Sequence, residues 1–253
     1  SEEDPELQSY ALKNLDQSVS NSWPQISEKI EVIKKLASKI DFIDYKRAAL
    51  LASKVSYYLN DLDAAFEYAL LAKDLFDINK HDDYTTKVIS HSIQCYIKII
   101  KEHKPINNAH SQFIYKIFQS LLKEKKYMSV LCLSIETHTL DLIRSILNEK
   151  QSLTPEAISL TMKTVNDYKF KQSLLKLFVD FSITHQDKFQ LSQLYSELED
   201  AKSIAELLVT LTASKNEDQL LLAYQISFEL AENANQKFLS NIILHLPTNM
   251  NSI

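Results

Sequence analysis

Apolar residues recur along most of the chain at steps of three and four, which is the spacing of one face of an α-helix. An early stripe consists of Ile26, Ile30, Ile33, Leu36, Ala37 and Ile40. A later stripe consists of Leu207, Leu208, Leu211, Leu221, Leu222, Tyr224, Ile226 and Phe228. The strict alternation of a half-buried strand does not persist anywhere in the sequence. The pattern therefore predicts an all-α protein with no sheet.

Prolines and turn residues divide this pattern into about fourteen helices. Pro5, Pro24 and Pro155 each follow a plausible N-cap, so each is expected in the first turn of a helix. Pro105 and Pro247 are expected to lie between helices or after the last one. The predicted helices are 5–20, 23–40, 44–59, 61–75, 82–103, 107–124, 126–137, 139–149, 155–168, 169–185, 188–198, 200–213, 216–232 and 234–246.

The short connections favour antiparallel helical hairpins, because consecutive helices joined by few residues must pack on each other. One hairpin, Tyr57–Leu75, resembles a tetratricopeptide repeat, with Asn60 at the left-handed turn position and Ala65 and Ala72 at the close contact. The expected fold is an α–α superhelix, a solenoid of such hairpins, forming a single elongated domain over residues 1–253.

Glycine is absent from all 253 residues, and this absence narrows the possible functions. Phosphate-binding loops, dinucleotide-binding turns, kinase glycine-rich loops and nucleophile elbows all need glycine at fixed positions. The sequence therefore excludes most enzyme classes that carry clear motifs. We expect no catalytic, cofactor-binding or small-molecule site.

The distribution of charged residues favours neither a nucleic-acid-binding protein nor a membrane-spanning one. The formal net charge is −5, and the densest basic run, Lys123–Lys126, holds an acid and is interpreted as a solvated helix end. The longest stretch without Asp, Glu, Lys or Arg, Phe238–Ile253, contains Pro247 and is not a membrane span.

Cys95 and Cys132 lie in apolar helical stretches and are expected to be buried, reduced thiols of a cytoplasmic or nuclear protein.

Candidate metal ligands do not form a recognised motif. The sequence contains no HExxH motif, in which two histidines four residues apart flank a glutamate. It also contains no CxxC motif and no Cys-His cluster, so we expect no metal site. Surface or helix-end roles are expected for the histidines, which are His81, His91, His103, His110, His138, His185 and His245.

Two serine–lysine spacings, Ser120 with Lys123 and Ser173 with Lys176, match the SxxK element of some hydrolases. Both are interpreted as amphipathic helix, because the KTG element of that class needs glycine.

Trp23, the single tryptophan, is interpreted as a core anchor between the first two helices, with a partner contact as the alternative. The other aromatic residues are interpreted as packing.

Four segments together resemble a known family. Tyr10–Ile33, Ala48–Tyr84, Val130–Leu147 and Leu220–Leu239 are similar to the N-terminal region of the non-ATPase regulatory subunit 1 family of the 26S proteasome. The order and spacing fit over about residues 4–246. The resemblance implies a rod of stacked helices that precedes a toroid of repeats, so this chain, which begins at Ser1 without methionine, is expected to be a fragment of a longer subunit.

The resemblance also implies the function. The expected function is a non-catalytic scaffold of the proteasome regulatory particle, located in cytoplasm and nucleus, with other base and lid subunits as partners. The alternative is an unrelated tetratricopeptide-like adaptor for a peptide or protein, and an enzyme is third. A groove with convergent Asn, Lys and Arg would favour the adaptor. The sequence assigns no residue to partner binding.

Overall fold

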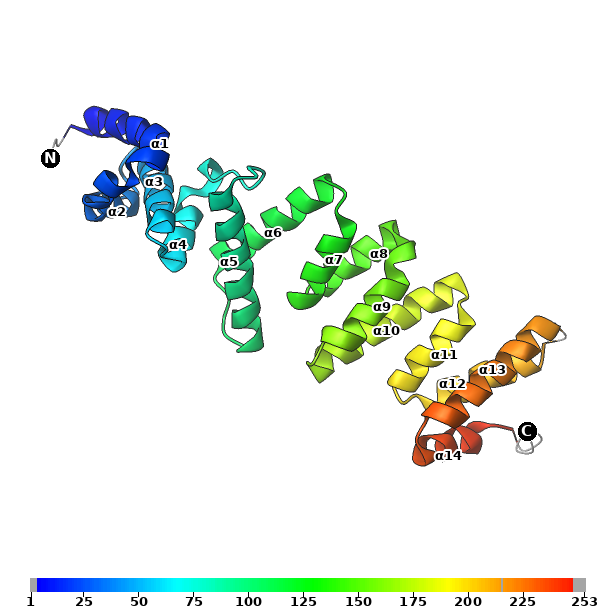
Figure 1. Ribbon diagram of the computed structural model, residues 1–253. Coiled ribbons are helices and arrows are strands. Elements are labelled where there is room, and N and C mark those ends of the chain that lie inside the picture. Colours follow the sequence, from blue (N-terminus) through cyan, green and yellow to red (C-terminus); the bar gives the residue numbers. More distant parts are fainter. Residues whose placement is uncertain (1–3, 215, 248–253) are drawn as a thin grey trace. The chain divides into compact units, whose positions relative to one another are not determined.

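The computed structural model describes residues 4–214 and 216–247 and shows only helices within them (Figure 1). The all-α prediction is confirmed, because fourteen α-helices and no strand lie in these ranges. In order they are α1 (Pro5–Ser27), α2 (Ile30–Ser38), α3 (Tyr45–Tyr58), α4 (Leu62–Ala72), α5 (Asp83–Lys101), α6 (Asn108–Lys123), α7 (Tyr127–Glu136), α8 (Leu140–Glu149), α9 (Thr154–Thr164), α10 (Tyr168–His185), α11 (Lys188–Glu197), α12 (Ala201–Thr212), α13 (Glu217–Asn233) and α14 (Gln236–His245). Short 3-10 helices, η1 (Lys73–Leu75) and η2 (Gln151–Leu153), adjoin α4 and α9.

The first two predicted helices are wrong. Pro24 lies inside α1, which runs on to Ser27, and does not open a second helix. The apolar stripe of α1, Leu12, Val19 and Ile26, is buried at steps of two turns on both sides of the proline. Pro24 itself is exposed, so the backbone carbonyl that loses its partner can be solvated, and burial of the stripe outweighs the local cost.

Trp23 therefore packs differently from the prediction. Its half-buried ring stacks on Tyr58 of α3, with ring centroids 5.8 Å apart and planes at 9°. A connected series of ring contacts joins Tyr58 to Tyr96 and includes aromatic side chains of α3, α4, α5 and α6. The interpretation of these aromatic side chains as packing is confirmed, but the anchor joins α1 to α3 and is not fully buried.

Residue contacts divide the chain into two compact units, Ser1–Val130 and Leu131–Ile253. The prediction of one elongated domain stays a prediction. In the first unit α3 and α4 lie side by side (Figure 1). Both helices carry alanines that are almost fully buried, namely Ala48, Ala49, Ala52, Ala65, Ala69 and Ala72. Small side chains let the two backbones approach closely, as predicted for Ala65 and Ala72.

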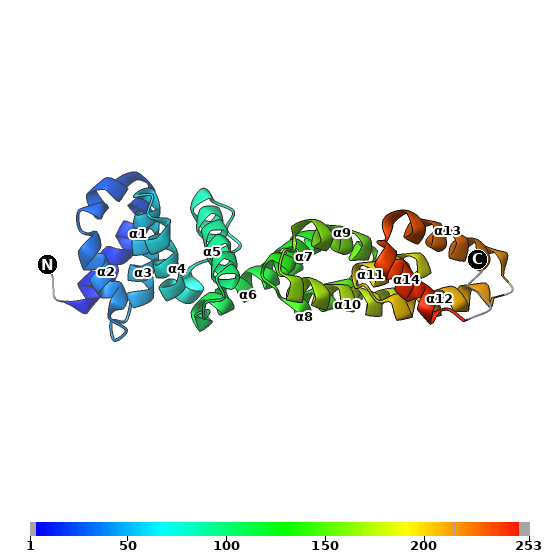
Figure 2. The same cartoon turned by 90° about the horizontal axis from the view of Figure 1, so that it is seen from below.

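The second unit contains two apolar clusters. The first cluster extends from α7 to α11 and includes the almost fully buried Phe178, Leu174 and Leu175 of α10. Ile204 and Leu211 of α12 belong to the second, in which α12 packs against α11, α13 and α14 (Figure 2). No helix in the described ranges combines the length and the apolar character that crossing a membrane requires.

Lys73, with φ 52° and ψ −113°, ends α4, and six further helix ends in the described ranges use a left-handed residue that is not glycine. These six residues have φ between 51° and 61° and are Asn60, His103, Lys125, His138, Gln186 and Glu199. At the first, the Asn60 N–H donates to the Tyr57 carbonyl at 3.0 Å, and the Asp61 N–H donates to the Ser56 carbonyl at 2.9 Å. The same pair of bonds recurs at the other five, which is the Schellman pattern. The prediction of a left-handed Asn60 is confirmed.

Aspartate follows three of these left-handed residues and starts the next helix. The carboxylates of Asp61, Asp187 and Asp200 accept hydrogen bonds from the backbone N–H groups of the first turns of α4, α11 and α12. Such a side-chain cap contributes about 1 kcal/mol. Two residues thus end one helix and begin another, and this short connection keeps consecutive helices in contact.

Replacing these left-handed residues by glycine is expected to be neutral or stabilising. A Cβ atom disfavours this conformation by about 1–2 kcal/mol, and asparagine is penalised least. Glycine also loses more chain entropy on folding, by about 0.4–1 kcal/mol. We expect Asn60→Gly to change the free energy of unfolding by less than about 0.5 kcal/mol, and Lys125→Gly and Glu199→Gly to raise it by about 0.5–1 kcal/mol in urea unfolding.

The matched control is Lys176→Gly in α10. Lys176 is exposed within a helix, so glycine there should lower the free energy of unfolding by about 1 kcal/mol. A loss of more than about 1 kcal/mol in Lys125→Gly or Glu199→Gly would contradict the left-handed assignment at that residue.

His110 lies in the first turn of α6, which agrees with the predicted helix-end role, but its side chain is buried and not on the surface. Its Nε2 lies 2.9 Å from the Ser92 carbonyl of α5, to which the neutral ring donates. Burial lowers the pKa of His110, and the hydrogen bond to Ser92 partly opposes this. The unfolded chain therefore binds this proton more readily than the folded chain.

This lowered pKa predicts that acid destabilises the fold through His110. The stability that neutral His110 contributes is complete above about pH 7 and falls as the pH drops below about 6.5. The slope from one such group is at most about 1.4 kcal/mol per pH unit. In urea unfolding between about pH 7 and pH 5, His110→Gln, which keeps a donor but does not titrate there, should have a shallower slope than the parent. Equal slopes would show that His110 titrates normally.

Candidate functional site

The two serine–lysine spacings do not form catalytic pairs. The Ser120 hydroxyl donates to the Asn79 side-chain oxygen at 2.7 Å, and the Ser173 hydroxyl donates to the Lys169 carbonyl at 3.0 Å. Neither hydroxyl proton is directed to a lysine amine, which a serine–lysine nucleophile requires. The interpretation of both spacings as amphipathic helix therefore agrees with the geometry.

A groove of about 680 Å³ lies within the second unit and is the natural place to look for a peptide site. It is bounded by α9, α11, α13 and α14. The Gln193 amide of α11 donates to the Glu229 carboxylate of α13 at 3.1 Å across it. Asn233 and Asn235 lie on its wall, but no lysine or arginine is among the described residues that line it. The groove therefore lacks the cationic side chains expected of the peptide adaptor.

Exposed apolar side chains form a stripe on α13. Leu221, Tyr224 and Phe228 follow one another at steps of three and four and all point away from the core. The opposite face of the same helix, with Ala223, Ile226 and Leu230, is buried. Large exposed apolar residues in a row are typical of surfaces that contact another protein.

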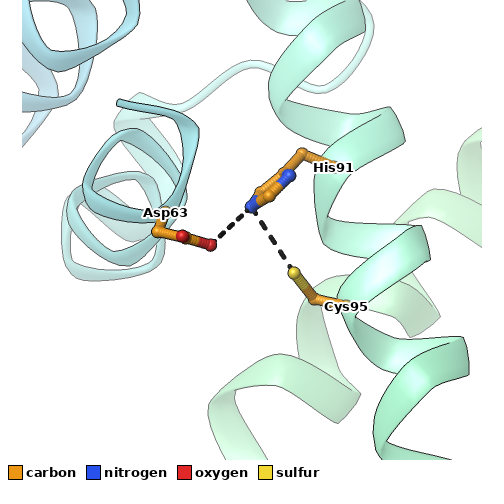
Figure 3. A group of neighbouring side chains, drawn as sticks. All are labelled: Asp63, His91 and Cys95. Carbon is orange, nitrogen blue, oxygen red and sulfur yellow. Dashed lines mark hydrogen bonds and ion pairs between the residues drawn. The ribbon is translucent and has the colours of Figure 1, made fainter. Parts of the chain in front are cut away.

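A group of three possible metal ligands lies in the first unit. Asp63 of α4 and His91 and Cys95 of α5 place their carboxylate, imidazole and thiol toward one another (Figure 3). His91 Nε2 lies 2.8 Å from Asp63 Oδ1 and 3.4 Å from Cys95 Sγ. All three possible ligand atoms lie within 4.8 Å of each other. No other such trio of His, Cys, Asp or Glu occurs in the part of the chain that the structure describes.

The two cysteines differ from the prediction in their burial. Neither Cys95 nor Cys132 forms a disulfide, as expected, but both are half-buried and not buried. Burial and the nearby Asp63 carboxylate raise the pKa of the Cys95 thiol, and Lys98 partly opposes this. Cys95 is therefore a weakly reactive thiol when no cation is bound.

The sequence contained part of the signal for this trio. His91 and Cys95 are four residues apart, so an α-helix brings them to the same face. A histidine four residues before a cysteine is not part of the HExxH or CxxC motifs, so the sequence motifs did not indicate the pair. Asp63 could not have been found, because it is 28 residues before His91 and only the packing of α4 on α5 brings it close.

Comparison with known proteins gives a family and several relatives. The family described as "26S proteasome subunit RPN2, N-terminal domain" matches residues 1–252. The chain is 33% identical, over 254 residues, to "26S proteasome non-ATPase regulatory subunit 1" of Drosophila melanogaster, covering 96% of this chain and 25% of that protein.

Two further relatives agree. The chain is 32% identical to "26S proteasome regulatory subunit rpn2" of Schizosaccharomyces pombe over 257 residues, with 98% of this chain and 27% of that protein covered. It is 31% identical to "26S proteasome non-ATPase regulatory subunit 1" of Dictyostelium discoideum over 255 residues, with 97% and 26% covered. The chain thus spans about a quarter of the length of these curated relatives.

Proposed function

The chain belongs to the family of RPN2 N-terminal domains of the 26S proteasome, and we propose that it acts as a non-catalytic helical scaffold of the regulatory particle. The family match over residues 1–252 carries this proposal, and it confirms the resemblance expected from the sequence. Because the chain spans about a quarter of its relatives, the assembly and partners of the whole subunit are part of the proposal.

The packing within each unit supports a mechanical role. The buried alanines of α3 and α4 and the aromatic contacts of the first unit pack its helices closely, and close-packed interiors transmit strain. Two apolar clusters pack the helices of the second unit together. Such a body can hold its surfaces at fixed separations, and its binding energy would come from extended surfaces such as the apolar stripe of α13.

The proposed partners are the other base and lid subunits of the regulatory particle, and the proposed location is cytoplasm and nucleus. Two cysteines without a disulfide are consistent with a reducing compartment. All three relatives described above are named as regulatory subunits, and two of them are named as non-ATPase subunits. These names support a role without catalysis.

A chimera tests the proposal. Residues 1–252 of this chain replace the matched region of the Schizosaccharomyces pombe subunit, and the tagged chimera is purified from that yeast for mass spectrometry. We expect it to recover ATPase-ring and lid subunits. The chain alone should recover much less, because broad, weak surfaces depend on a second attachment to raise their effective concentration.

The controls are the unaltered yeast subunit and the same subunit without its matched region. A chimera that accumulates as well as the unaltered subunit but recovers none of these partners would disprove the proposed function. Equal recovery by the chain alone and by the chimera would show that the chain holds a strong binding site of its own, which would contradict the weak-surface mechanism.

A further inference from the structure

We propose that Asp63, His91 and Cys95 form a zinc site that joins α4 to α5 (Figure 3). The inference is independent of the proposed scaffold function, because it rests only on these three side chains and the helices that carry them. Each contributes one atom that can bind a cation, and the three atoms converge from two helices that already pack against each other.

Local structure holds all three ligands in place. His91 and Cys95 are four residues apart on α5, one turn of the helix, so their side chains leave the same face. Asp63 lies in the first turn of α4, whose position is fixed by the capping bond from the Ala64 N–H to the Asp61 carboxylate. Burial of Phe66 and Ala69 on α4 and of Val88 and Ser92 on α5 keeps both helices oriented around the site.

The two contacts within the trio compete for one nitrogen. Asp63 Oδ1 and Cys95 Sγ both approach the same atom, Nε2 of His91. That nitrogen carries at most one hydrogen. If it donates to Asp63 it cannot accept from the thiol, and if it accepts from the thiol it has no hydrogen for the carboxylate. A cation in place of these protons lets all three atoms direct a lone pair to one centre.

The ligand types indicate which cation fits. A thiolate, an imidazole and a carboxylate together suit zinc, whereas magnesium and calcium prefer oxygen ligands alone. Zinc is usually four-coordinate, so three protein ligands leave one position for water. The Asp63 side chain is 85% exposed and that of His91 is 19% exposed, so the site opens to solvent on the Asp63 side, where water can occupy this position.

Zinc at this site would connect a residue of the α3–α4 hairpin to α5. A cation that binds the folded chain and not the unfolded chain raises its stability. The expected consequence is a zinc-dependent increase in the melting temperature of the first unit, which contains all three ligands.

Cobalt is the first probe, because a thiolate bound to Co²⁺ gives a charge-transfer absorption that zinc lacks. The 253-residue chain, kept reduced, is titrated with Co²⁺ and then with Zn²⁺. We expect one Co²⁺ per chain, a thiolate band that saturates with it, and loss of the band when Zn²⁺ displaces the cobalt.

Single substitutions locate the site. Cys95→Ser should abolish the thiolate band, and Asp63→Asn and His91→Gln should each weaken binding by at least about 10-fold, the loss seen when even an outer partner of a zinc ligand is removed. The matched controls are Cys132→Ser and Asp180→Asn, a half-buried thiol and an exposed carboxylate of the second unit, which should leave the titration unchanged.

Circular dichroism checks that each variant is folded, and thermal unfolding gives a second measurement. Zinc should raise the melting temperature of the parent and of the two controls, but not that of Cys95→Ser. The proposal is wrong if the folded parent gives no thiolate band. It is also wrong if the band persists in Cys95→Ser, or if zinc stabilises Cys95→Ser as much as the parent.

Discussion

Every helix of this chain has to end without glycine, and the rest of the structure depends on how that is done. Six helix ends among the described residues place a residue with a Cβ atom in the left-handed conformation, at a local cost of about 1–2 kcal/mol each. The two backbone bonds of the Schellman pattern offset this cost, and at three of these ends an aspartate cap starts the next helix. The helices are therefore joined by short connections, and neighbouring helices stay in contact. One such pair is α3 and α4, which carry the buried alanines.

Much of the fold could be predicted from the sequence, because helical periodicity and cap residues are local signals. After the first two helices, the predicted boundaries agree with the structure to within about four residues. The failure at Pro24 has a physical cause. A proline is compatible both with a first turn and with an exposed interior position, and only burial of Leu12, Val19 and Ile26 on one continuous face decides between them.

The functional features were less accessible to sequence reasoning. The groove of the second unit and the Asp63–His91–Cys95 trio depend on contacts between helices, which periodicity does not specify. The i, i+4 spacing of His91 and Cys95 was readable, whereas the approach of Asp63 was not. The family, in contrast, was accessible through segments spread over the chain. The proposed scaffold function rests on that family, and the proposed zinc site rests on side-chain chemistry, so either proposal can fail without the other.

Backbone NMR of the 253-residue chain tests most directly whether left-handed residues replace glycine at the helix ends. Three-bond couplings and Cα chemical shifts report the sign of φ for each residue. The account predicts positive φ at Asn60, His103, Lys125, His138, Gln186 and Glu199, with helical values on the preceding residues. Negative φ at most of these positions would contradict it, because the helices would then have to be connected in another way.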